Sequence, residues 1–186
     1  MISNDLVTLV TEQDVVLGSM DKIEAHRGEG KLHRASSVFL FRNSQATGHI
    51  EFLIQKRSEK KIVGAGQWAN TVCGNVWPDE SYEACARRRL SFELGITDES
   101  LKLQDAEMFR YQAKCNEEFS ENEIVHIFVG WYDGGVNPNV DEVADWRWAK
   151  WEDARSLKEI ETGWQWAPWF ELFTKNIGDS ISSIKN

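Results

Sequence analysis

The segment at residues 124–132 constrains the fold more than any other part of the sequence, because it is almost continuously apolar. With Glu123 in front, it reads Glu-Ile-Val-His-Ile-Phe-Val-Gly-Trp-Tyr. A run of this composition is typical of a strand, and a strand that is apolar on both sides lies inside a covered sheet. The run is much shorter than the roughly 20 residues of a membrane-spanning helix. We therefore expect a central strand here and no membrane segment.

The elements expected around this strand mix strands and helices without a regular βαβ alternation. A helix is expected over residues 79–94, where Asp79 or Ser81 can cap the N-terminus and Gly95 stands at the C-terminal glycine position. Further strands are expected over residues 5–10 and 15–19, paired as a hairpin, and over residues 36–41, 50–56, 68–73, 108–113 and 145–148. Two more helices are expected over residues 152–160 and from Pro168, as the first helical residue, to about residue 175. The sequence thus predicts an α+β fold in which helices flank a mixed sheet.

Length and charge limit the classes of protein that remain. The 186 residues suit one domain, so we expect a single domain over residues 1–186. Asp and Glu number 30 against 21 Lys and Arg, and no basic tail is present, which argues against nucleic-acid binding. Three cysteines without a CxxC pair make no disulfide framework, and residues 1–10 lack the positive charge of a signal peptide. These features predict a cytoplasmic protein in a reducing compartment.

Two short motifs could carry chemistry. Cys73 and Gly74 follow an expected strand; a buried cysteine is usually inert, whereas the glycine would let a ligand approach the backbone. Glu121 and Glu123 are two residues apart on a strand and therefore share a face. Their carboxylates are either a solvated strand end or ligands of a divalent metal, since like charges beside an apolar strand need a cation or a proton.

Histidines, basic residues and tryptophans add further candidates. His26 and His33 flank a glycine-containing segment and are either surface residues or metal ligands, whereas His126 falls on the opposite strand face from Glu123. Basic clusters at residues 56–61 and 87–89 are either solvated faces or sites for a phosphate-like anion, and Arg89 can also pair with Glu93 along a helix. Nine tryptophans fill a core or line an apolar pocket.

The residues from Gly74 to Ile96 resemble a Nudix box, G-x5-E-x7-R-E-U-x-E-E-x-G-U, in which U is a bulky aliphatic residue. Arg89 and Phe92 stand where two of the glutamates are expected. Over about residues 5–175 the chain resembles the type I isopentenyl-diphosphate Δ-isomerases of the Nudix superfamily. The matching pieces are His26 and His33, Arg57 and Lys61, residues 68–74, 88–89 and 93–95, Phe109-Arg110-Tyr111, Glu121-Asn122-Glu123 and residues 166–169.

This resemblance implies an α/β/α Nudix-type sandwich and the interconversion of isopentenyl and dimethylallyl diphosphate in isoprenoid biosynthesis. It makes Cys73 and Glu123 the acid/base pair, with Tyr111 assisting Glu123 and Trp169 facing the carbocation. The metal ligands that it implies for one divalent ion, Mn²⁺ or Zn²⁺, are His26, His33, Glu121 and Glu123. It further implies that Glu93 and the Cys73 carbonyl bind Mg²⁺ on the diphosphate, and that Lys22, Arg57, Lys61 and Arg89 hold the diphosphate itself.

Asn75 stands where the isomerase pattern has a third histidine ligand. Its side-chain oxygen can complete the metal site, or the residue can cap the turn after Gly74 and the metal is lost. The alternative functions are a Nudix hydrolase of another diphosphate and a non-catalytic diphosphate-binding paralogue. We expect a small allylic or homoallylic diphosphate as the partner, no nucleic acid or membrane, and a monomer or weak dimer.

Overall fold

The computed structural model describes residues 6–156 and 164–177, in which nine strands form one sheet. The strands are β1 (Leu6–Val10), β2 (Val16–Asp21), β3 (His33–Asn43), β4 (Ile50–Arg57), β5 (Trp68–Ala69), β6 (Val72–Asn75), β7 (Gln104–Lys114), β8 (Ser120–Trp131) and β9 (Val143–Lys150). The helices are α1 (Lys22–His26), α2 (Tyr82–Leu94), α3 (Trp151–Arg155) and α4 (Phe170–Ile177). Within the described residues, none of these helices has the length and apolar composition that crossing a membrane requires.

β3 is the centre of the hydrogen-bonding pattern of the sheet. It pairs in parallel with β8 and antiparallel with β4 and β6. β8 pairs on its other edge with β7, and β4 pairs with β5 and β9. The sheet is therefore mixed, as predicted. Because β8 has a neighbour on each edge, the central position expected for the apolar segment is confirmed.

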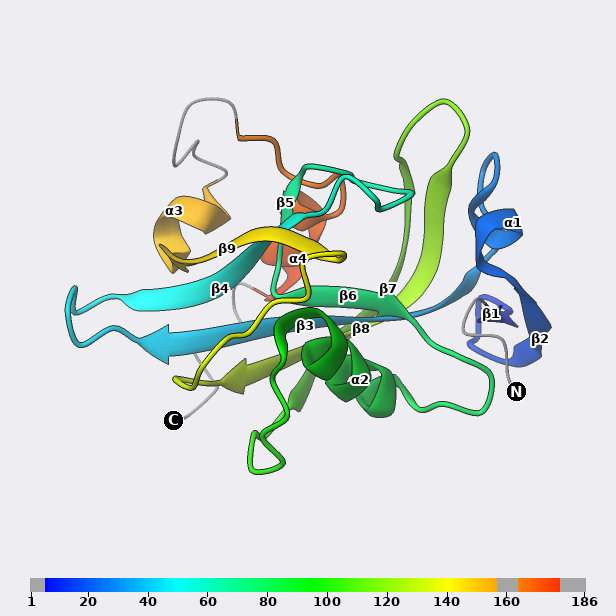
Figure 1. Cartoon of the computed structure of the whole chain (residues 1–186). Coiled ribbons are helices and arrows are strands. Elements are labelled where there is room, and N and C mark those ends of the chain that lie inside the picture. The colour runs from blue at the N-terminus through cyan, green and yellow to red at the C-terminus, as the bar shows by residue number, and fades with distance from the viewer. Residues whose placement is uncertain (1–5, 157–163, 178–186) are drawn as a thin grey trace.

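Side chains of β3 alternate between two apolar layers. Val38 and Leu40 point to the face covered by α2 and share an apolar cluster with its side chains. Phe39 and Phe41 point to the other face and pack in a second cluster, with Phe170 of α4 among its members. Figure 1 shows α2 on one side of the sheet and α3 and α4 on the other. Each fully buried large apolar side chain contributes roughly 1.5–3 kcal/mol. The predicted sandwich is confirmed.

Capping residues fix both ends of α2. Ser81 Oγ accepts a hydrogen bond from Ala84 N at 3.1 Å, so Ser81 rather than Asp79 is the N-cap. At the other end Gly95 has a left-handed φ of 65°, and its N–H donates to Ser91 O at 3.0 Å. The C-terminal glycine expected from the sequence is confirmed.

Gly95→Ala is expected to lower the free energy of unfolding by about 2 kcal/mol. A Cβ at this position would lie 2.7 Å from the backbone oxygen of Asn137, and the left-handed backbone is strained for any residue with a Cβ. Gly135→Ala is the matched control, because a Cβ there would meet nothing within 4 Å. Urea unfolding followed by circular dichroism measures the difference, and equal midpoints for the two variants would contradict the expectation.

The single strand predicted over residues 68–73 is wrong, because β5 and β6 are separate. Asn70 lies between them, and its Nδ2 donates to Val38 O and Val72 O, both at 3.0 Å. A buried side chain that bonds to backbone carbonyls competes with the regular strand ladder. The chain therefore bends at Asn70 instead of continuing as one strand.

The ends of several other elements differ from the expectation. Helical periodicity does not predict α1, because its five residues are too few to show a repeat. Pro168 is not the first residue of α4; it lies in a turn in which Phe170 N donates to Ala167 O at 2.9 Å. The helix predicted over residues 152–160 is observed as α3, and its residues 157–160 lie outside the described residues, as does residue 5 of the predicted hairpin.

Candidate active site

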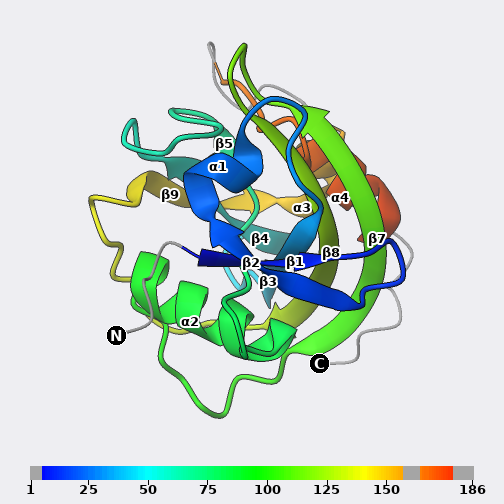
Figure 2. The ribbon, with the colours of Figure 1, turned by 90° about the vertical axis from the view of Figure 1, so that its right-hand side faces the viewer.

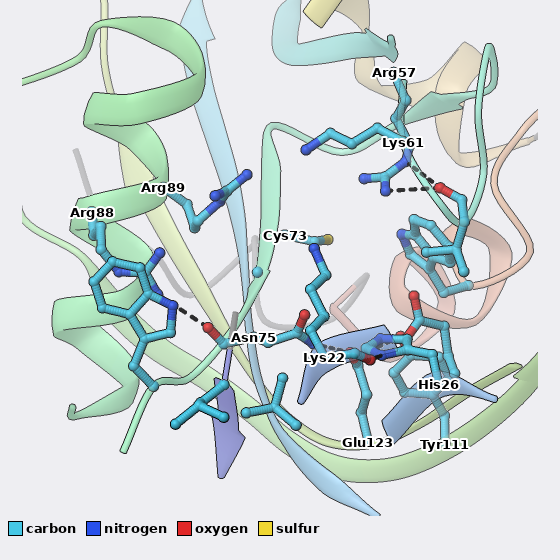
Figure 3. Close-up of a pocket in the computed structure, with 17 residues that line it drawn as sticks. Lys22, His26, Arg57, Lys61, Cys73, Asn75, Arg88, Arg89, Tyr111 and Glu123 are labelled. Carbon is cyan, nitrogen blue, oxygen red and sulfur yellow. Dashed lines mark hydrogen bonds and ion pairs between the residues drawn. The ribbon is translucent and has the colours of Figure 1, made fainter. Parts of the chain in front are cut away.

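One cavity gathers most of the residues that the sequence singles out. Figure 3 shows Arg57 and Lys61 on one side of it, Arg89 on the other and Cys73 between them. α1, which carries Lys22 and His26 of the lining, lies in front of the sheet in Figure 2. The predicted residues that line the cavity are Lys22, His26, Arg57, Lys61, Cys73, Asn75, Arg88, Arg89, Tyr111, Glu121, Glu123 and Trp169. His33 and Glu93 are fully buried and contact residues of this lining.

Two histidines approach each other from α1 and β3. The ring centroids of His26 and His33 are 4.7 Å apart. In each ring, Nδ1 lies 2.7 Å from a backbone carbonyl oxygen, that of Lys22 for His26 and that of Lys31 for His33. A carbonyl can only accept, so each Nδ1 carries hydrogen. The Nε2 of each neutral ring is therefore left with a lone pair, which is the arrangement found in metal-binding histidines.

Two carboxylates of β8 face these ring nitrogens. His26 Nε2 lies 3.1 Å from Glu121 Oε2, and His33 Nε2 lies 3.4 Å from Glu123 Oε1. The four side chains are buried, and their ligand atoms lie within 4.8 Å of one another. While the His26 ring is neutral, Glu121 Oε2 has no hydrogen-bond donor among the described residues; a protonated His26 would donate to it. A buried carboxylate oxygen that meets imidazole lone pairs fits a divalent cation, so this donor set suits a metal ion.

The surroundings of Glu121 and Glu123 shift the pKa values of these two carboxyl groups in opposite directions. Burial disfavours both carboxylates, but the hydrogen bond and charge of His26 hold the pKa of Glu121 below its usual value. For Glu123, burial and the charge of Glu121 raise the pKa. Burial lowers the pKa of His26, yet the Glu121 carboxylate outweighs it and the pKa is raised. Of the two carboxyl groups, Glu121 is therefore the one that loses its proton at the lower pH.

Asn75 reaches the same cluster from β6. Its Nδ2 lies 3.0 Å from His33 Nε2 and donates to Glu123 Oε1 at 3.2 Å. The side chain thus points at the histidines and carboxylates, which argues against a role as a turn cap. The amide nitrogen faces the cluster, so an oxygen ligand requires a half-turn of the amide group.

The thiol of Cys73 is held by two buried polar side chains. Cys73 Sγ donates to Asn70 Oδ1 at 3.3 Å and lies 3.4 Å from Ser37 Oγ. Asn70 Nδ2 donates to Ser37 Oγ at 2.8 Å, so the three groups form a closed ring of hydrogen bonds. Burial raises the pKa of the thiol to about 12. Cys73 therefore keeps its proton at neutral pH, in a fixed position on the cavity wall.

Aromatic side chains complete the deep end of the cavity. The hydroxyl of Tyr111 donates to Glu123 Oε2 at 2.5 Å. Trp169 is 2% exposed, and the guanidinium carbon of Arg57 lies 5.1 Å from its ring centroid. An indole beside a cation can stabilise positive charge in a desolvated site.

The basic side chains expected to hold a diphosphate lie together. Burial, followed by repulsion from Lys61, Arg89 and Arg57, lowers the pKa of Lys22. Burial also lowers the pKa of Lys61, although Glu93 opposes the shift. Arg89 packs its stem over Gly74, where a Cβ would lie 2.5 Å from Arg89 Cγ. Positive charge is therefore concentrated at one end of the cavity.

Two carboxylates partly neutralise this positive charge. Arg89 Nε donates to Glu93 Oε1 and Arg89 Nη2 donates to Glu142 Oε2, each at 2.8 Å. Lys61 also donates to Glu142, and its Nζ lies 4.0 Å from Glu93 Oε2. Burial disfavours a charged Glu93, but the neighbouring Arg89 and Lys61 outweigh it and lower its pKa. The helical pair of Arg89 and Glu93 is thus present and extends into the cavity.

The sequence of this chain is similar to a known domain family and to several named enzymes. The NUDIX domain family matches residues 31–170. An isopentenyl-diphosphate Delta-isomerase 1 of Aromatoleum aromaticum is 42% identical over 144 residues, which make up 77% of this chain and 76% of the relative. An isopentenyl-diphosphate Delta-isomerase of Serratia proteamaculans is 34% identical over 94% of this chain and 92% of the relative. The chain belongs to the isopentenyl-diphosphate Delta-isomerase family.

The fold is shared with a solved structure of another protein. A crystal structure of a protein from Deinococcus radiodurans superposes on this chain with a TM-score of 0.71 at 20% sequence identity. The match covers 91% of this chain and 97% of the chain from Deinococcus radiodurans. At that identity the likeness bears on the fold alone.

Lys60 and Arg87 of the predicted clusters point away from the cavity, whereas Arg88 lines it beside Trp77. Lys60 pairs with Asp141 at the exposed surface, and Arg87 pairs with Glu83 along α2. Arg88 stacks on the Trp77 ring at 3.6 Å from its centroid. For Lys60 and Arg87 the solvated-face interpretation therefore holds. His126 pairs with Asp105 on the opposite face of β8, as its parity predicts.

Three polar residues beside the cavity of this isomerase-family chain have no sequence signal of their own. Ser37 and Asn70 lie inside segments that look like ordinary strands, and Glu142 lies in a turn before β9. Their partners come from distant parts of the chain. The one hint is that Asn70 and Thr71 are polar residues within the otherwise apolar segment 68–73, and buried polar side chains demand hydrogen-bond partners.

Proposed function

We propose that this chain interconverts isopentenyl diphosphate and dimethylallyl diphosphate in isoprenoid biosynthesis. The observation that carries the proposal is the placement of a protonated thiol, Cys73, and a carboxyl group, Glu123, on one cavity whose other end is lined with basic side chains. Membership of the isopentenyl-diphosphate Delta-isomerase family supports the same reaction.

The reaction moves a double bond by one carbon. One group gives a proton to the terminal alkene carbon, and a second removes a proton from the methylene on the other side. We assign these roles to Cys73 and Glu123. Tyr111 donates to Glu123 Oε2 and fixes that oxygen, and the face of Trp169 stabilises the tertiary cation between the two steps. The buried walls exclude water that would trap this cation.

We assign a divalent ion, Mn²⁺ or Zn²⁺, to His26, His33, Glu121 and Glu123, with Asn75 beside them. When bound, the ion would supply the positive charge that lets two adjacent carboxylates stay ionised. A second ion, Mg²⁺, would accompany the diphosphate at Glu93 and the carbonyl of Cys73. Lys22, Arg57, Lys61 and Arg89 would hold the phosphate oxygens, and their binding energy would place the short hydrocarbon tail between Cys73 and Glu123.

Hydrolysis of another diphosphate is less well supported. A Nudix hydrolase uses the box glutamates as a metal-binding set, and here Arg89 and Phe92 replace two of them. Arg89 donates to Glu93, which alone remains of the last three box glutamates, and Phe92 is half exposed on the surface of α2. A non-catalytic diphosphate-binding role is weakened by the presence of both Cys73 and Glu123. The proposal includes a single domain over residues 1–186, a cytoplasmic location, a monomer or weak dimer, and no nucleic-acid or membrane partner.

Incubation with isopentenyl diphosphate and Mg²⁺ in D₂O tests the proposal. We expect dimethylallyl diphosphate that carries deuterium in a methyl group, because the proton that is added exchanges with solvent while it resides on the protein. NMR of the product identifies both the bond position and the label. Release of inorganic phosphate or pyrophosphate, without a shifted double bond, would favour the hydrolase.

Asn75→His is expected to tighten binding of Zn²⁺ or Mn²⁺ by about tenfold or more. The Asn75 side chain already reaches His33 and Glu123, so an imidazole there would add a nitrogen donor to the existing cluster. Calorimetry on metal-stripped protein measures the affinity. An unchanged affinity would mean that the four other side chains do not converge on one ion.

A further inference from the structure

Glu142 contacts the basic cluster but has no part in the proton transfers. It lies in the turn before β9, and its side chain is 21% exposed, at the rim of the cation cluster. Its Oε2 accepts hydrogen bonds from Arg89 Nη2 at 2.8 Å and from Lys61 Nζ. Both donors belong to groups that we assign to the diphosphate.

The backbone holds Glu142 firmly in this position. Ser58 N donates to Glu142 O at 3.0 Å, which ties the turn to the segment that carries Lys61. Glu142 N donates to Asn139 O at 2.9 Å, and Asn139 N donates to Glu93 O at 2.8 Å, which ties the same turn to α2. The turn therefore holds the Glu142 carboxylate between the segment that carries Lys61 and α2, which carries Arg89.

A carboxylate and a phosphate oxygen are both anionic acceptors, so they compete for the same N–H groups. Glu93 does not compete in the same way, because it is fully buried and Gln55 Nε2 also donates to it at 2.8 Å. Glu142 is instead partly exposed, so its carboxylate can return to solvent when another anion takes its donors. With this carboxylate in place the basic cluster is partly neutralised before any substrate is bound.

We propose that Glu142 is a built-in competitor of the substrate diphosphate. Its carboxylate pairs with Lys61 and Arg89 while the site is empty. When phosphate oxygens bind these two side chains, the pairs with Glu142 break, and they form again when the product leaves. Glu142 thereby weakens diphosphate binding and speeds release. This proposal rests on the assignment of Lys61 and Arg89 to the diphosphate under the proposed function.

Binding of inorganic pyrophosphate to metal-free protein tests this role by calorimetry. Glu142→Gln keeps the shape of the side chain and removes its charge, so we expect affinity for pyrophosphate to rise at least about fivefold. Asp141→Asn is the matched control: it removes the same charge from the adjacent residue, whose partner Lys60 lies at the exposed surface. For this variant we expect a change of less than about twofold.

Unchanged or weaker pyrophosphate binding by Glu142→Gln would overturn the proposal. If this variant binds pyrophosphate more weakly only when Mg²⁺ is added, Glu142 is a ligand of that ion instead of a competitor. Arg89→Gln and Lys61→Gln test the assignment of the diphosphate site separately from the role of Glu142. If neither substitution weakens pyrophosphate binding, the assignment of the diphosphate site itself fails, whatever Glu142 does. Urea unfolding of each variant checks that the fold is retained.

Steady-state kinetics with isopentenyl diphosphate give a second readout. Loss of a competitor lowers KM, and slower product release lowers kcat or leaves it unchanged. We therefore expect KM to fall by at least about threefold in Glu142→Gln, with no rise in kcat. A residue with a structural role alone would raise KM or lower kcat without tightening pyrophosphate binding, and that pattern would contradict the proposal.

Discussion

Cys73→Ala is expected to lower kcat for isomerisation by about 10²–10⁴-fold, the usual contribution of a general acid or base. The thiol is the proton-bearing group on its side of the cavity, and alanine offers no proton. The fold should survive, because Asn70 keeps its bonds to Ser37, Val38 and Val72. Pyrophosphate binding should also survive, since the basic side chains are untouched.

Cys115→Ala is the matched control for this variant. Cys115 follows β7, is partly buried, and has its Sγ 3.6 Å from Ala113 O. It does not line the cavity, so we expect activity close to that of the unsubstituted protein. Turnover by Cys73→Ala within about tenfold of that protein would exclude Cys73 as the group that transfers the proton.

Glu123→Gln is expected to reduce kcat by about 10²-fold or more, and added metal should not restore it. Glu123 accepts from Tyr111 at one oxygen and from Asn75 at the other, and the amide nitrogen of glutamine cannot accept at either position. The substitution therefore removes a base and a metal-binding oxygen together.

Glu93→Gln makes the same chemical change at the other carboxylate and is expected to behave differently. It should raise the concentration of Mg²⁺ needed for half-maximal activity, and excess Mg²⁺ should restore turnover. The reason is that Glu93 lies with Arg89 and Lys61, away from the histidines. Activity titrated against Mg²⁺ for both variants distinguishes the roles, and equal rescue of both would show that they are wrongly assigned.

Much of the site follows from local sequence rules. Parity along one strand places Glu121 and Glu123 on one face and His126 on the other, and the structure agrees. Gly95 marks the end of α2 because few other residues adopt its backbone conformation. These features depend on neighbours a few residues away, so the sequence contains what is needed to infer them.

Other features depend on which segments become neighbours in space. A buried serine or asparagine in a strand gives no sign of its partner, so the ring formed by Ser37, Asn70 and Cys73 could not be inferred. Glu142 is one of 30 acidic residues, and nothing nearby in the sequence separates it from a solvated one. α1, which carries both Lys22 and His26, is too short for a periodic pattern.

The parallel pairing of β3 with β8 has a consequence for the order of folding. It sets His33 opposite Glu123, two residues that are far apart along the chain. Closing so long a loop is slow compared with forming helices or hairpins, so these two strands meet late. The histidines and carboxylates cannot form a metal site before that moment. An ion that binds them stabilises only chains whose strands have joined in the right register. Metal uptake during refolding should therefore lag behind helix formation and report on the completion of the sheet.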